Sequence, residues 1–127
     1  MKGRILVVDD EADIVDLTML ILEQQGYSVI SASNGDDAIE KAASEKPDLI
    51  LLDLLMPGKD GLEVCRILKR NENTSRIPII VSSTFSELGH QRKALEAGAV
   101  AYLGKPFNFE VMSAEIENAL GLKPVEA

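Results

Sequence analysis

A short apolar stretch that ends on an aspartate constrains this chain more than any other feature. Residues 48–61 read DLILLDLLMPGKDG, so an apolar run ends at Asp53 and the chain soon enters a Met-Pro-Gly turn. Such a run, bounded by turn residues, predicts a strand buried on both faces of a parallel sheet, although periodicity alone leaves a buried helix open. Pro57 and Gly58 favour the strand because they end the run soon after Asp53. The carboxylate is then expected at the carboxyl end of a strand, where open α/β sheets bind their ligands.

Short apolar runs alternate with amphipathic segments along the whole chain. In addition to the strand that ends at Asp53, the pattern predicts strands at 4–8, 27–32, 79–83 and 99–103. It predicts helices at 11–25, around 38–43, and at 62–70, 87–96 and 109–120. The first helix is expected to turn an apolar face made of Ile14, Leu17, Ile21 and Leu22 toward the core. Five strand–helix units predict a parallel sheet with helices on both faces and right-handed crossovers.

The composition indicates one acidic domain. The 127 residues are expected to form a single domain, with a core over about residues 4–120 and no output domain. A formal net charge of -8 would repel phosphate backbones, so direct nucleic-acid binding is not expected. No apolar run approaches the roughly 18 residues of a membrane helix, and no secretory signal is found, so a cytoplasmic location is expected. Cys65, the only cysteine, is interpreted as a small core residue.

Four of the predicted strands end in side chains that suit phosphoryl chemistry. They deliver Asp9 and Asp10, Asp53, Ser83, and Lys105, which should converge on one edge of a doubly wound sheet. A solvated acidic patch is the plainer reading of three such carboxylates, but they also suit a hard cation such as Mg²⁺. An aspartate beside such a metal can act as a nucleophile toward phosphorus. Lys105 would pair with phosphoryl oxygens, and Ser83 could donate a hydrogen bond to the same group.

These residues lie within longer segments that resemble the receiver domain of bacterial two-component response regulators. The matching segments are ILVVDDE, LLDLLMPGKDGLE, IPIIVSS and AGAVAYLGKPF, and the resemblance extends from about Arg4 to Leu120. It implies an α/β fold of the flavodoxin-like kind, as in the family's chemotaxis member, with a five-stranded parallel sheet of order 2-1-3-4-5 and five helices. It also implies phosphorylation of the middle aspartate by a sensor histidine kinase or a phosphotransfer protein, with Mg²⁺ as cofactor.

The resemblance assigns a role to each candidate residue. Asp53 becomes the phospho-acceptor, and Asp9 and Asp10 hold the Mg²⁺ directly or through water, together with Asp53 and the backbone carbonyl of Leu55. Lys105 pairs with the phosphoryl group.

The resemblance further implies a switch. Ser83 is its hydroxyl, and Tyr102 matches the aromatic residue that changes rotamer when Ser83 moves toward the phosphate; from the residues alone, Tyr102 would be a partly buried strand tyrosine. After phosphorylation, the fourth helix, fifth strand and fifth helix present a different surface to a downstream protein.

The chain departs from the usual family pattern at two places. Leu55, Thr84 and Phe85 lie where the family tunes access to the phosphoryl group: Thr84 narrows the approach, and Leu55 and Phe85 cannot orient an attacking water. The domain is therefore expected to remove its own phosphoryl group slowly. Beyond accepting and removing that group, it is not expected to be an enzyme.

Val100 and Ala101 replace the acidic residues with which winged-helix regulators usually form dimer salt bridges, so a monomer or a weak phosphorylation-linked dimer is expected.

Three alternative functions follow from the same residues. A phosphatase of the haloacid dehalogenase type needs a second aspartate where Leu55 lies, and a flavodoxin-like cofactor binder needs a phosphate loop after the first strand, which is missing. A binding module that works without phosphorylation is the main alternative, and the intact acidic set argues against it.

His90, a lone helical histidine, is expected to be exposed and inert.

Overall fold

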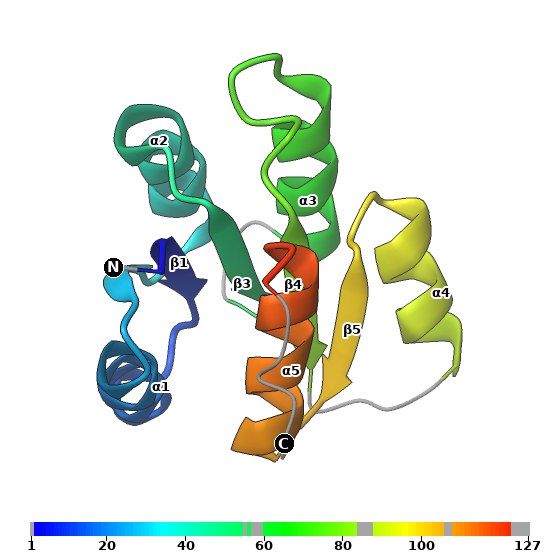
Figure 1. Cartoon of the computed structure of the whole chain (residues 1–127). Coiled ribbons are helices and arrows are strands. Elements are labelled where there is room, and N and C mark those ends of the chain that lie inside the picture. Colours follow the sequence, from blue (N-terminus) through cyan, green and yellow to red (C-terminus); the bar gives the residue numbers. More distant parts are fainter. Residues whose placement is uncertain (1, 55, 57–59, 84–87, 106–107, 123–127) are drawn as a thin grey trace.

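Strands and helices alternate along the chain, with five of each in the residues that the structure describes (Figure 1). The structure is a computed structural model, and it describes residues 2–54, 56, 60–83, 88–105 and 108–122. The strands are β1 (Arg4–Val8), β2 (Ser28–Ala32), β3 (Leu49–Asp53), β4 (Ile79–Ser83) and β5 (Ala101–Gly104). The helices are α1 (Ala12–Gln24), α2 (Gly35–Glu45), α3 (Gly61–Arg70), α4 (Leu88–Glu96) and α5 (Phe109–Ala119).

The five strands form one parallel sheet in the order β2-β1-β3-β4-β5. This order confirms the predicted doubly wound, flavodoxin-like architecture. β3 is the central strand and pairs with β1 on one side and β4 on the other. Asp53, the last residue of β3, therefore ends the middle strand of the sheet.

Each face of the sheet is covered by helices and has its own apolar core (Figure 1). Successive residues of a strand point to opposite faces. In β1, Leu6 packs in the core beneath α2, α3 and α4, and its neighbour Val7 packs in the core beneath α1 and α5. β3 and β4 are buried on both faces along their whole length. Their sequences are therefore apolar at consecutive positions up to the polar carboxyl ends, instead of alternating between apolar and polar residues.

The buried face of α1 includes Leu22 as predicted, and Ile21 packs partly buried against the same core, but the prediction was wrong for Leu17. Val15, Thr18 and Leu22 are buried, whereas Leu17 is 46% exposed and Leu20 is 54% exposed. The buried positions are spaced three and four residues apart, as one face of a helix requires. Apolar residues occur around most of this helix, so the sequence pattern did not define which of them face the sheet.

Two strands begin later than predicted, because the preceding residues complete helix ends. Tyr27 precedes β2, and its N–H donates to the carbonyl of Leu22 in α1 at 3.1 Å. Ala99 precedes β5, and its N–H donates to the carbonyl of Ala94 in α4 at 3.0 Å. These backbone groups are therefore used by the turns that close α1 and α4.

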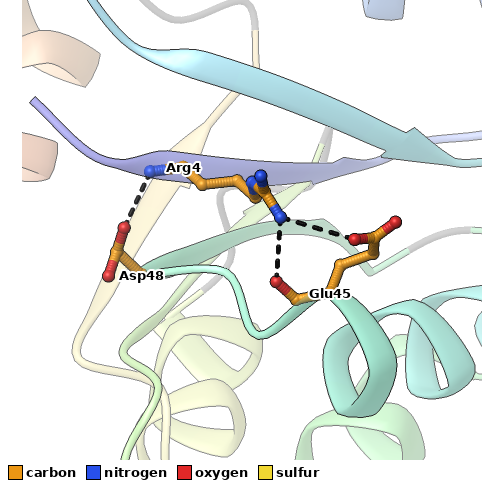
Figure 2. Close-up of polar contacts among 3 residues, drawn as sticks. All are labelled: Arg4, Glu45 and Asp48. Atoms are coloured by element: carbon orange, nitrogen blue, oxygen red, sulfur yellow. Dashed lines mark hydrogen bonds and ion pairs between the residues drawn. The ribbon is translucent and has the colours of Figure 1, made fainter. Parts of the chain in front are cut away.

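A polar network joins β1 to the α2–β3 connection (Figure 2). The backbone N–H of Arg4 donates to Asp48 Oδ2 at 2.8 Å, and the N–H of Asp48 donates to the carbonyl of Arg4 at 2.7 Å. The Arg4 guanidinium contacts the carbonyl of Glu45 at 3.2 Å and its carboxylate at 3.4 Å. The network lies at the amino ends of β1 and β3, so it is at the edge of the sheet opposite Asp53.

Candidate functional site

The carboxyl end of β3 places Asp53 in the middle of a polar edge. Its backbone pairs with that of Ser82 in β4, and its side chain is buried, with 4% of the residue exposed. Aspartate is rarely buried to this degree unless charged or polar neighbours compensate for its lost hydration. The neighbouring strand ends supply those groups.

Two more carboxylates follow β1, the strand beside β3. Asp9 is buried and Asp10 is exposed. Asp9 Oδ1 accepts a hydrogen bond of 3.0 Å from the N–H of Glu11, which fixes its orientation at the start of α1. One carboxylate oxygen from each of Asp9, Asp10 and Asp53 lies within 4.8 Å of the other two. An all-oxygen set of this size, with one exposed member, fits a hard divalent cation such as Mg²⁺ that keeps part of its water shell.

Lys105 follows β5 and brings a positive charge to these carboxylates. Its Nζ lies 2.6 Å from Asp9 Oδ2 and 3.6 Å from Asp53 Oδ2, and its side chain is 11% exposed. Its backbone N–H donates to the carbonyl of Ser83 at 2.6 Å, which anchors it beside β4. Burial by itself lowers the pKa of Lys105, but the hydrogen bond to Asp9 and the neighbouring negative charges outweigh it and raise the pKa above the usual lysine value. The ammonium is therefore charged at neutral pH.

The predicted switch residues lie on β4 and β5. Ser83 is the last residue of β4 and is fully buried. Tyr102 is partly buried, pairs in register with Val81 and packs against the core beneath α2, α3 and α4. Because Ser83 is two residues beyond Val81, Ser83 and Tyr102 project to the same face of the sheet.

Gly61 is a supporting residue that the sequence analysis did not single out. It begins α3, and its N–H donates to the carbonyl of Leu54 at 3.2 Å. A Cβ on Gly61 would lie 2.6 Å from the Leu54 Cα and 2.8 Å from the carbonyl oxygen of Asp53. The chain that leaves β3 thus returns so closely to its own start that a side chain would displace the backbone of Asp53. The only signal in the sequence was a second glycine shortly after the Pro57-Gly58 turn.

Some predicted residues lie outside the part of the chain that the structure describes. Leu55, Thr84 and Phe85, predicted to control access to the phosphoryl group, are among them. The side chain of His90 is also outside it.

Cys65 is buried, and its Sγ donates to the carbonyl of Ala97 at 3.5 Å. Burial raises the pKa of its thiol. The interpretation of Cys65 as a core residue is confirmed.

In the described parts of the chain, no helix combines the length and the apolar character that a membrane crossing requires.

Relatives of known class match almost the whole chain. The family model of the response regulator receiver domain matches residues 5–117. The alkaline phosphatase synthesis transcriptional regulatory protein PhoP of Bacillus subtilis is 41% identical over 127 residues, which is 100% of this chain and 52% of PhoP. The chain thus spans about half the length of the curated relatives it matches.

Solved structures show the same fold. A two-component response regulator from Clostridium difficile has a TM-score of 0.86 and 31% identity, covering 93% of this chain and 95% of that one. The receiver domain of sensor histidine kinase PA1611 from Pseudomonas aeruginosa, with a magnesium ion coordinated in its active site cleft, has a TM-score of 0.86 and 29% identity over 94% of this chain and 98% of that one. The fold, the family model and these relatives show that this chain belongs to the receiver domain family of two-component response regulators.

Proposed function

We propose that this receiver domain is a switch operated by phosphorylation of Asp53. The observation that supports it most directly is the arrangement around that carboxylate. Asp53 ends the central strand, two further aspartate side chains lie within 4.8 Å, and the Lys105 ammonium contacts both Asp9 and Asp53. The phosphodonor is a sensor histidine kinase or a phosphotransfer protein, and a cytoplasmic location is part of the proposal.

The carboxylates of Asp9, Asp10 and Asp53, with the backbone carbonyl of Leu55, would hold Mg²⁺. When bound, the ion neutralises charge on the phosphoryl oxygens and so lowers their repulsion by the carboxylates. The chain's own residues perform the transfer. A carboxylate oxygen of Asp53 attacks phosphorus, an O–P bond forms, and the P–N bond to the donor histidine breaks as its imidazole leaves. Lys105, which stays protonated, then pairs with the new phosphoryl oxygens.

Phosphorylation changes the output surface through Ser83 on β4 and Tyr102 on β5. Ser83 and Tyr102 share one face of the sheet, so movement of the hydroxyl toward the phosphoryl group frees space on the side of the tyrosine. The surface of α4, β5 and α5 then binds a downstream protein. On this surface Leu95 is 46% exposed and Val100 is 52% exposed, which suits a protein contact.

Three further expectations belong to this proposal. The 127 residues act as one receiver domain, and any DNA contact in a longer protein comparable to PhoP would come from outside these residues. Leu55, Thr84 and Phe85 make self-dephosphorylation slow. The domain is monomeric or dimerises weakly after phosphorylation.

The test is intact-protein mass spectrometry after incubation with acetyl phosphate and Mg²⁺. Wild type is expected to gain one phosphoryl group and to lose it slowly, and chelation of Mg²⁺ is expected to prevent the gain. Asp53→Asn should gain none, whereas Asp48→Asn, which changes a carboxylate at the opposite edge of the sheet, should behave as wild type. An adduct on Asp53→Asn would place the acceptor elsewhere, and no adduct on wild type from acetyl phosphate or a cognate kinase would favour the phosphorylation-independent binding module.

A further inference from the structure

A pocket of about 290 Å³ opens beside the carboxylate cluster, between the carboxyl ends of β1 and β2. The N-terminal part of α1 and one side of α2 form its walls. Four of its lining side chains are carboxylates, and two of these are the candidate magnesium ligands Asp9 and Asp10. Lys41 is the one basic residue among the described residues that line it.

Two contacts fix the Lys41 ammonium at this edge of the sheet. Its Nζ donates to the carbonyl of Ser31 in β2 at 2.5 Å and pairs with Asp37 Oδ2 at 3.2 Å. Ser31 lies opposite Val7 in the parallel register of β1 and β2. Val7 is two residues before Asp9, a step of about 7 Å along a strand. The ammonium therefore lines the same pocket as the candidate ligands Asp9 and Asp10, while its ion pair in the described residues is with Asp37.

We propose that Lys41 is a counter-charge that weakens cation binding at Asp9, Asp10 and Asp53. The inference rests on the proposed function, since it concerns the Mg²⁺ that phosphorylation requires. The Lys41 ammonium and the ligands Asp9 and Asp10 line one pocket, so a divalent cation at this cluster and the ammonium would repel each other, and added salt would weaken that repulsion. Lys41 thereby keeps the metal weakly held and exchangeable, while Lys105, which contacts Asp9 and Asp53, offsets part of the charge of the same carboxylates.

The proposal predicts that removing the Lys41 charge tightens Mg²⁺ binding. For Lys41→Met, the dissociation constant measured by isothermal titration calorimetry at low ionic strength should fall about two- to tenfold, and the difference should shrink as salt is added. Lys41→Gln should give the same result, because glutamine is neutral yet keeps a donor for the Ser31 carbonyl. Lys41→Arg keeps the charge and should bind Mg²⁺ as wild type does.

A matched control separates this local effect from the net charge of the protein. Lys93→Met removes the same charge from the exposed last turn of α4 and should leave Mg²⁺ binding unchanged. Thermal unfolding in a chelator shows which variants fold, and if Lys41→Met does not, Lys41→Gln provides the measurement.

Each outcome decides one question. Wild type that binds no Mg²⁺ overturns the magnesium part of the proposed function and this inference with it. Wild type that binds Mg²⁺, with unchanged affinity in the neutral Lys41 variants or an equal gain in Lys93→Met, overturns this inference alone.

Discussion

At the scale of single residues, Lys105 carries the positive charge of the candidate site. Its ammonium lies 2.6 Å from Asp9 and 3.6 Å from Asp53, so its single positive charge offsets part of the negative charge of the three carboxylates. A cation that binds the same oxygens competes with it for Asp9. Lys105 is therefore both the partner of the proposed phosphoryl group and a competitor of the proposed metal.

Lys105→Met should bind Mg²⁺ several-fold more tightly than wild type, because the carboxylates lose their internal counter-charge. Without metal, the variant should be less stable, since removing one partner of a buried ion pair leaves uncompensated charge at a cost of about 3–5 kcal/mol. Calorimetric Mg²⁺ titration and urea unfolding in a chelator measure the two effects. Lys105→Arg retains the charge and serves as control. Weaker Mg²⁺ binding by Lys105→Met would contradict the competition.

Tyr27 is the one described residue whose buried side-chain oxygen or nitrogen has no hydrogen-bond partner. The ring lies beneath the Lys2 ammonium, 5.5 Å from its centre, and 4% of the residue is exposed. Burial, and to a lesser degree the charge of Glu117, raises the pKa of the phenol. A buried hydroxyl without a partner costs about 1–3 kcal/mol, so removing it while keeping the packing of the ring is expected to stabilise the fold.

Tyr27→Phe keeps the ring and should leave stability at neutral pH unchanged or raise it by about 1 kcal/mol. The difference in stability between Tyr27→Phe and wild type should grow at alkaline pH. The unfolded tyrosine releases its proton near its ordinary pKa while the folded one still holds it, so wild type loses stability as the pH rises between those two values. Urea unfolding of both proteins from pH 7 to 11 measures this. A loss of more than about 1 kcal/mol at neutral pH would show that the hydroxyl has a partner.

At the scale of elements, α1 shows how packing chooses one face of a helix that has apolar residues on several. Leu22 is fully buried in the core beneath α1 and α5, and Leu17, on the same helix, is 46% exposed. Leu17 lies in the middle of the helix and Leu22 in its last turn. The two leucines differ in burial, so the same substitution at both positions compares a buried site with an exposed one.

Leu22→Ala should lower the free energy of unfolding by about 2–5 kcal/mol, because it leaves a cavity in a packed core. Leu17→Ala should lower it by only about 1 kcal/mol or less, because nearly half of the residue is already exposed and alanine favours the helix. Urea unfolding gives the two values, provided that the dependence of the unfolding free energy on urea concentration is the same in both variants and in wild type. Equal losses would show that Leu17 is buried in solution.

At the scale of the whole molecule, the net charge of -8 and the clustered carboxylates work against the folded state, and a bound cation relieves part of that repulsion. If Mg²⁺ binds only the folded chain, it stabilises that chain by RT ln(1 + [Mg²⁺]/Kd), about 2.7 kcal/mol at one hundred times Kd. Binding at strand ends that meet only in the folded sheet satisfies this condition.

Mg²⁺ should therefore raise the thermal unfolding temperature of wild type beyond the effect of NaCl at matched ionic strength. Asp9→Asn removes one proposed ligand and should reduce the Mg²⁺-specific part of the shift, whereas Asp48→Asn should keep it. Differential scanning fluorimetry measures the shifts. Equal shifts by Mg²⁺ and by matched NaCl in wild type would mean that the cation acts only by screening.

Local patterns in the sequence were enough to predict the element order, the parallel sheet and the strand ends at which Asp9, Asp53, Ser83 and Lys105 lie. The physical reason is that each depends on a short stretch: an apolar run buried on both faces, a turn residue that ends it, and the polar residue between them. Parallel strands then bring their carboxyl ends to one edge without further information.

Only the tertiary structure decided which groups contact one another at that edge. All of the following depend on distances between elements: the exposure of Leu17, the shorter contact of Lys105 with Asp9 than with Asp53, the approach of Gly61 to the Asp53 backbone, and the place of Lys41 in the pocket that Asp9 and Asp10 also line. Those distances come from the packing of helices on the sheet, which no local sequence pattern encodes, because differences of an ångström or two are set by many side chains at once.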